Sequence, residues 1–228
     1  MLGTNELSAY YSLYERQNAH YLDASGEETR DVFDIRFAGD RNGFDWDTEA
    51  MVQLGTVGDK NIRAWALGTR FGYTLDDLEW TPRIGLQFDA ASGDKAHGDD
   101  TLGTFNPLFP NGYYFTLAGY TGYTNLIHFK PSITFKPNDQ LTATAALGLQ
   151  WRQTTADAIY LQPNQPIKGT AGKGSLWSGA YAQLRLDYAF TPNLTGAIEA
   201  VHYEIGSTIR AAGGKNGNYL GVQLALAW

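Results

Sequence analysis

The amino-acid sequence predicts an all-β protein: a transmembrane antiparallel up-and-down β-barrel of about ten strands, forming a single domain over residues 1–228. Apolar and polar residues alternate along most of the chain, which is the period of strands with two unlike faces. With their flanks, these segments are roughly 11–15 residues long, enough to cross a bilayer as tilted strands. Short and long connections alternate between them, as in barrels with short periplasmic turns and long extracellular loops.

The first five predicted strands all carry large apolar side chains on one face and polar or small side chains on the other. In the first of them, Leu7 and Leu13 oppose Ser8 and Ser12. Polar turns rich in Gly, Asp and Asn separate the segments, as expected at strand ends. The predicted strands span residues 7–13, 33–37, 44–54, 65–73 and 84–90.

The second five predicted strands show the same alternation with two irregularities. Pro131 lies inside the sixth strand, where a proline cannot donate to the ladder. In the ninth strand the pattern is ambiguous, so it assigns neither Glu199 nor His202 to a face. The predicted strands span residues 127–135, 141–151, 180–188, 194–205 and 220–228.

The connections predict two unlike rims. The short turns lie at 39–43, 76–80, 137–140 and 191–193, and the long loops at 92–123 and 155–174. An even number of strands places both chain ends at the short-turn rim. Because so apolar a segment is unstable in water, we expect loop 92–123 to fold into the lumen as a constriction; a lid over the rim is the alternative. The predicted constriction residues are Phe105, Asn106, Pro107, Phe109 and Pro110.

Composition excludes several classes of protein. There is no cysteine, and hence no disulfide framework or thiol chemistry. No apolar run is long enough for a transmembrane helix, and the mean hydropathy is −0.33. A net charge of −7 argues against nucleic acid as a partner. Met1 is followed directly by Leu-Gly-Thr-Asn with no signal-peptide pattern, which we interpret as a mature chain whose leader has been removed.

The last nine residues resemble the assembly signal of bacterial outer-membrane barrels, an apolar alternation that ends on an aromatic residue. Trp46, Trp65 and Trp151 lie on apolar faces near segment ends, as aromatic belts require. This resemblance implies a bacterial outer-membrane location, with outer-membrane lipids and the barrel-assembly machinery as partners. It also makes the last strand the expected closing strand, paired with residues 7–13. The signal residues are Leu220, Val222, Leu224, Leu226 and Trp228.

From residue 105 onward the chain resembles the alginate-export family of outer-membrane β-barrels. The resemblance rests on Phe-Asn-Pro-Leu-Phe-Pro-Asn-Gly-Tyr at 105–113 and Asn-Leu-Ile-His-Phe-Lys-Pro-Ser-Ile-Thr-Phe-Lys-Pro at 125–137. It implies a monomeric channel for passive diffusion of small or anionic solutes, of the alginate or polyuronate type, through an arginine-lined lumen. Family barrels have about eighteen strands, so this chain with about ten resembles a shortened barrel or the C-terminal part of a longer one.

Charged residues on the polar faces are the candidate lumen lining. One interpretation is an electropositive track that holds carboxylates; the other is ion pairs that fill a narrow, non-conducting lumen, as in a structural or engineered barrel. Both remain open. The predicted lumen residues are Arg16, Arg36, Arg70, Arg83, Lys130, Arg152, Arg185, Asp34, Asp45, Asp47 and Glu49.

Catalytic and metal-binding motifs do not stand out, so we expect neither an enzyme nor a cofactor. A divalent cation among Asp94, Asp99 and Asp100 is one interpretation of the long loop, but a solvated acidic loop is the preferred one. His97 and His128 lack a second histidine at ligand spacing and are not expected to bind metal.

Overall fold

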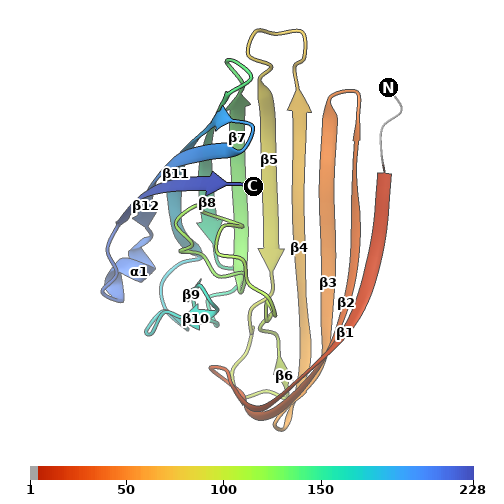
Figure 1. The fold of residues 1–228 in the computed structure, drawn as a ribbon. Helices are drawn as coiled ribbons and strands as arrows, with labels where there is room; N and C mark the ends of the chain where they lie inside the picture. Colours follow the sequence, from red (N-terminus) through yellow and green to blue (C-terminus); the bar gives the residue numbers. More distant parts are fainter. Residues whose placement is uncertain (1–4) are drawn as a thin grey trace.

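The protein is one antiparallel meander of ten strands, described over residues 5–228 by a computed structural model (Figure 1). Each strand pairs with the next long strand in the chain, and the two-residue β6 adds a short parallel pairing to β4. The predicted fold class is confirmed. Residues 1–4, on which the interpretation of a removed leader mainly rests, lie outside the described part.

The elements follow one another with little structure between them except in the long loops. Within residues 5–228 the only helix is short, and none is long and apolar enough to span a membrane. The elements are β1 (Asn5–His20), β2 (Ser25–Arg41), β3 (Phe44–Val57), β4 (Lys60–Thr74), β5 (Arg83–Ala91), β6 (Thr101–Leu102), β7 (Leu126–Phe135), β8 (Leu141–Trp151), β9 (Tyr160–Leu161), β10 (Gln165–Pro166), β11 (Trp177–Thr191), β12 (Leu194–Ile205), α1 (Ser207–Ala211) and β13 (Gly217–Leu226).

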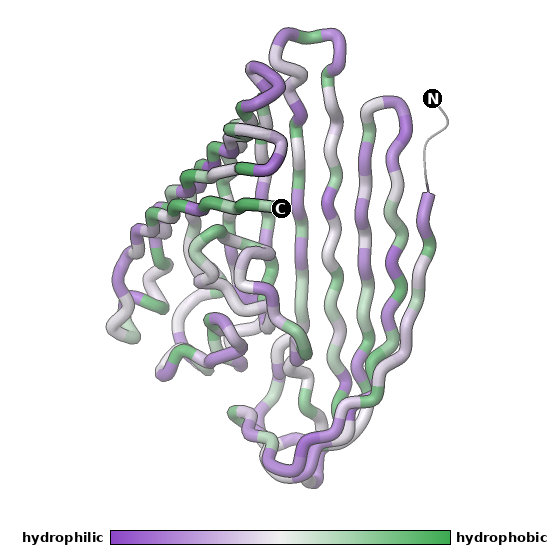
Figure 2. Tube along the Cα trace, viewed as in Figure 1, coloured by the Kyte–Doolittle hydropathy of each residue, from purple (hydrophilic) through white to green (hydrophobic). Residues whose placement is uncertain are grey.

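The sheet has an apolar outer face and a mixed inner face. Phe33 on β2 pairs with Val52 on β3, and Val52 pairs with Trp65 on β4, so one continuous apolar band crosses neighbouring strands. Their neighbours in sequence, such as Asp34 and Gln53, point inward. The resulting alternation along the strands is visible in Figure 2. An exposed apolar band of this kind is stable when hydrocarbon covers it.

The two rims differ as the sequence predicts. The connections at 42–43, 75–82, 136–140 and 192–193 lie at one rim, together with the N-terminal end of β1 (Figure 1). The opposite rim carries the long connections at 92–125 and 152–176, together with α1. The long loops turn back against the inner face of the sheet, and the buried apolar clusters lie between loop and sheet.

Two sequence ambiguities are resolved by the register. On β12, Glu199 pairs with the inward-facing Arg185 and is buried, whereas His202 faces outward. On β7, the pairing to β8 runs through Phe129 and resumes at Ser132, skipping the proline between them. The ladder is interrupted there because Pro131 has no N–H to donate.

The two ends of the meander each have one free edge. Within residues 5–228, β1 pairs with β2 alone and β13 with β12 alone. The expected pairing of residues 7–13 with the last strand is therefore not present in this structure. The edge strands are also the most exposed of the sheet, with Leu7 70% and Leu220 74% accessible.

Gly148 on β8 leaves space that the ring of Tyr181 on β11 fills. A Cβ at Gly148 would lie 2.1 Å from the ring. We expect Gly148→Ala to push the Tyr181 ring away and to lower the free energy of unfolding by about 1–3 kcal/mol, measured by urea unfolding in lipid vesicles. Gly112→Ala is the control, because its Cβ would meet nothing closer than 3.7 Å. Equal losses in both variants would contradict this account.

Candidate functional site in the barrel interior

The loop between β5 and β7 occupies the interior of the sheet. Its ends are adjacent, since Ala91 pairs with Leu126. Between those ends the chain crosses the inner face: the Tyr114 hydroxyl donates to Asp89 Oδ1 at 2.7 Å, and Lys130 Nζ donates to the Phe115 carbonyl at 2.9 Å. The Leu117 amide reaches β11, donating to Gln183 Oε1 at 3.3 Å.

A buried polar network holds the centre of this loop. His128 Nδ1 lies 2.8 Å from Asp89 Oδ2, and its Nε2 lies 2.9 Å from the Tyr181 hydroxyl. That hydroxyl also donates to the Phe115 carbonyl at 2.7 Å. The Phe115 ring stands edge-on against the His128 ring at 5.1 Å. Sequence reasoning missed this network, although Asp89 and His128 lie on polar faces of consecutive predicted strands and are direct cross-strand partners.

A second anchor fixes the start of the aromatic segment to β3. Gln53 donates to the Asn106 carbonyl at 2.8 Å and accepts from the Asn106 amide at 3.0 Å. The Arg30 guanidinium, fully buried on β2, pairs with Glu28 at 2.8 Å and also donates to Gln53. Phe105 is buried against Ala64 and Ala66. Arg30 is not among the predicted lumen residues, because its position lies ahead of the predicted second strand although β2 begins at Ser25.

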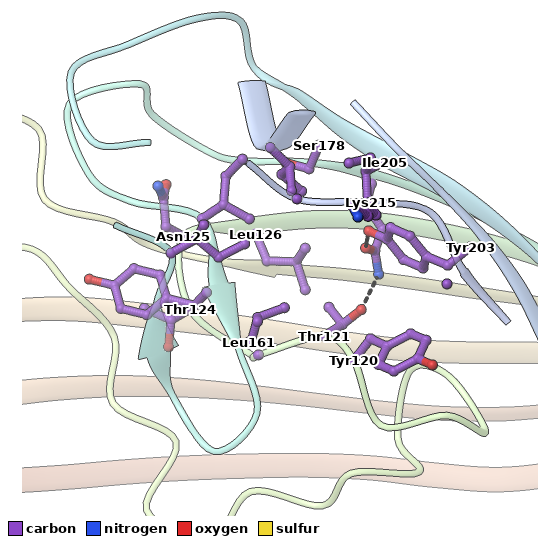
Figure 3. Close-up of a pocket in the computed structure, with 18 residues that line it drawn as sticks. Tyr120, Thr121, Thr124, Asn125, Leu126, Leu161, Ser178, Tyr203, Ile205 and Lys215 are labelled. Carbon is purple, nitrogen blue, oxygen red and sulfur yellow. Dashed lines mark hydrogen bonds between the residues drawn. The ribbon is translucent and has the colours of Figure 1, made fainter. Parts of the chain in front are cut away.

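The infolded loop leaves two cavities. One, of about 630 Å³, lies between the aromatic segment and β1–β3 and is lined by side chains that include Tyr10, Glu49 and Met51. The other, of about 360 Å³, lies beside β8, β11 and β12 and is mainly apolar. Figure 3 shows the latter, with Leu126, Leu161 and Ile205 around it and with the Thr121 hydroxyl accepting from Gln150.

The predicted constriction residues all belong to this loop, but they are not equivalent. Phe105 and Asn106 are buried anchors. Pro107, Phe109 and Pro110 line the larger cavity, and Phe109 is 93% exposed. The segment therefore has a fixed base on β3 and β4 and an accessible apolar tip.

Most predicted lumen cations face inward and are paired with carboxylates. Arg36 contacts Asp47 at 2.7 Å, and Arg83 contacts Asp45 at 2.5 Å. Arg16 pairs with Glu28 at 2.8 Å, and Arg185 pairs with both Asp187 and Glu199. Of the remaining predicted acids, Glu49 lines the larger cavity, while Asp34 is buried and its Oδ2 has no hydrogen-bond partner among the described residues.

Two inward cations differ from the rest. Arg70 on β4 is exposed and lies over the Tyr114 ring at 4.4 Å. Lys130 on β7 bonds the Phe115 carbonyl. Within residues 5–228, neither makes an ion pair with a carboxylate at 4.0 Å or less. Unneutralised positive charge on the inner face is thus concentrated beside the infolded loop.

Arg152 does not line the lumen. This arginine follows the last residue of β8 and is only 1% exposed to solvent. Burial lowers the pKa of its guanidinium, while the nearby Asp157 raises it. The guanidinium donates to backbone carbonyls of the 155–175 loop, so it organises that loop and is not available to a solute. Its acceptors are the carbonyl oxygens of Ser175, Thr155, Asp157, Thr170 and Lys173.

An outer face for lipid, two unlike rims and a charged interior partly filled by a loop are the features of an up-and-down β-barrel of the outer-membrane type. The family model described as alginate export matches residues 1–223. The chain therefore belongs to the alginate export family, and membership of this family points to a porin-like transport protein of the outer membrane.

Comparison with individual proteins adds little to this identification. No curated protein matches the chain. A solved structure described as the NanC porin is similar to it at 11% sequence identity, covering 99% of this chain and 98% of that one, with a TM-score of 0.46. A similarity of this size carries no argument about function.

Proposed function

We propose that this protein is a passive channel for small anionic solutes, of the uronate type that the family description suggests. The observation that carries the proposal is the exposed, unpaired guanidinium of Arg70, with Lys130 on the same inner face. A carboxylate that passes the loop would accept bidentate hydrogen bonds from the Arg70 guanidinium. The other inward arginines already donate to carboxylates of the protein and are less available to a solute. We further propose that the protein acts as a monomer and is inserted by the barrel-assembly machinery.

The larger cavity supports the same proposal. It lies between the aromatic segment and β1–β3, and Tyr114, which stacks under Arg70, is among its lining residues. Aromatic rings beside a cation provide an apolar surface for a sugar ring and a charge for its carboxylate. The solute would therefore pass between the loop and the β1–β3 wall.

Arg70→Ala tests the proposal in planar lipid bilayers. Because the variant removes the exposed unpaired guanidinium from the inner face, the ratio of anion to cation permeability should fall at least about two-fold, measured from the reversal potential across a salt gradient. Arg63→Ala is the matched control, since Arg63 is exposed on the opposite face of the same strand. An unchanged ratio in Arg70→Ala, or an equal fall in both variants, would refute the role of Arg70.

A structural barrel with a closed lumen is the second candidate function. It is favoured by the contacts of the infolded loop with β3, β5, β7 and β11, and by the ion pairs that use most of the interior charge. The same bilayer measurement separates the two candidates. Steady single-channel current supports the channel, and its absence from refolded protein supports the closed barrel.

A further inference from the structure

Three potential metal ligands meet at the long-loop rim, outside the interior described above. Asp23 lies in the connection between β1 and β2, and Asp94 and His97 lie in the loop that follows β5. One ligand atom from each residue lies within 4.8 Å of the other two. The cluster thus joins two connections that are far apart in the sequence.

His97 is held in the tautomer that a metal ligand needs. Its Nε2 lies 2.8 Å from the Ala156 carbonyl oxygen, which can only accept, so Nε2 carries the proton. The lone pair of a neutral ring is then on Nδ1, which faces Asp23 Oδ1 at 3.6 Å. A backbone carbonyl that orients the second ring nitrogen is the usual support of a metal-binding histidine.

Asp94, the third member of the cluster, has an unsatisfied side-chain oxygen. The residue is 4% exposed, and its Oδ2 has no hydrogen-bond partner within the described chain. Its Oδ1 is occupied by the Gly103 amide at 3.1 Å. A buried carboxylate oxygen without a partner is costly, and a bound cation would remove that cost.

Asp23 likewise uses one carboxylate oxygen for hydrogen bonds within the protein and has the other near His97. Its Oδ2 accepts from Lys60 Nζ at 2.5 Å and from the Gly98 amide at 2.8 Å. Its Oδ1 remains on the side of His97 Nδ1. In each of the three residues one polar atom is hydrogen-bonded to the protein, which leaves the second polar atom of each side chain as the candidate ligand.

We propose that Asp23 Oδ1, Asp94 Oδ2 and His97 Nδ1 bind one divalent transition-metal ion of the Zn²⁺ type. Nitrogen with two carboxylate oxygens suits Zn²⁺, whereas Ca²⁺ and Mg²⁺ prefer oxygen alone. The separation of 3.6 Å between Nδ1 and Oδ1 is close to the edge of about 3.4 Å in a tetrahedron with bonds of about 2.1 Å. Water would complete the coordination.

The ion would fasten the infolded loop to the β1–β2 connection. Asp94 and His97 precede the aromatic segment, and Asp157 joins this region to the other long loop by accepting from the Asp94 amide at 2.9 Å. Metal binding would therefore stabilise the folded arrangement of the rim.

Calorimetric titration of Zn²⁺ into refolded, tag-free protein in detergent tests the site. We expect one ion per chain, with affinity at least about ten-fold weaker in His97→Ala and Asp94→Asn, because loss of one of three ligands removes a large part of the binding energy. His202→Ala and Asp99→Asn are the controls, as an outward-facing histidine and an acid of the same loop outside the ligand set.

Heat-modifiable electrophoretic mobility shows whether each variant is folded. As a second measurement, Zn²⁺ should raise the melting temperature of the parent protein but not that of His97→Ala. The proposal is overturned if folded parent protein binds no stoichiometric Zn²⁺, or if His97→Ala binds it as tightly as the parent. Equal affinity for Ca²⁺ would also overturn the assignment to a transition metal.

Discussion

Removing the infolded aromatic segment should raise single-channel conductance several-fold. The Thr124 hydroxyl donates to the Phe105 carbonyl at 3.0 Å, so the two ends of residues 106–123 already lie together and a short glycine linker can join them. The deletion takes away the backbone that crosses from β5 to β11, and water can enter its place. Strand register is retained because β5 and β7 pair directly.

The matched control shortens a connection at the opposite rim. Residues 76–81 can be replaced by two glycines, because the Leu75 amide already donates to the Pro82 carbonyl at 2.9 Å. That variant leaves the interior unchanged and should conduct like the parent. A folded 106–123 deletion with the parent's conductance would show that the segment does not limit the current.

Arg152→Ala should destabilise the protein by at least about 3 kcal/mol, because several carbonyl oxygens in the 155–175 loop lose a charged donor and some become buried without a partner. Urea unfolding in lipid vesicles measures the loss, and limited proteolysis locates it in residues 153–176. Arg152→Lys retains the charge but not the planar array of donors, and should restore only part of the stability.

Arg210→Ala is the control for Arg152→Ala. Arg210 lies in α1, is exposed, and makes only long hydrogen bonds, to the Ile205 carbonyl at 3.4 Å and to Asn216 at 3.3 Å. The Arg210→Ala variant should lower the free energy of unfolding only slightly. A loss in Arg152→Ala no larger than the loss in Arg210→Ala would contradict the assigned role of Arg152.

The sheet could be predicted from sequence because a period of two is a local property. Once Leu184 is assigned to the lipid face, Gln183 and Arg185 must face inward, and the structure places them there. The prediction that Arg152 faces the lumen is wrong because the alternation of faces applies only within the strand, and β8 ends at Trp151. Face assignment from sequence is valid only as far as the strand continues.

The interior could be predicted only in part, because its contacts join segments that no periodicity relates. The sequence could not show whether the Arg36 guanidinium is free to bind a solute or is paired with Asp47, because this depends on the side-chain geometry between β2 and β3. The grouping of Asp23 with Asp94 and His97 requires both the strand topology and the path of the loop. Of the three acids that the sequence offers for a cation, Asp94 belongs to this group, whereas Asp99 and Asp100 accept hydrogen bonds from Thr101.

The two free sheet edges have a consequence for the order of events during insertion. Backbone N–H and C=O groups along β1 and β13 cannot stay unpaired in hydrocarbon, so these edges must find partner strands. All neighbouring long strands of the meander are consecutive in the chain, so these pairs can form early. A contact between the two edges is non-local and has the largest entropy cost of loop closure. Edge pairing should therefore be the slowest step of assembly.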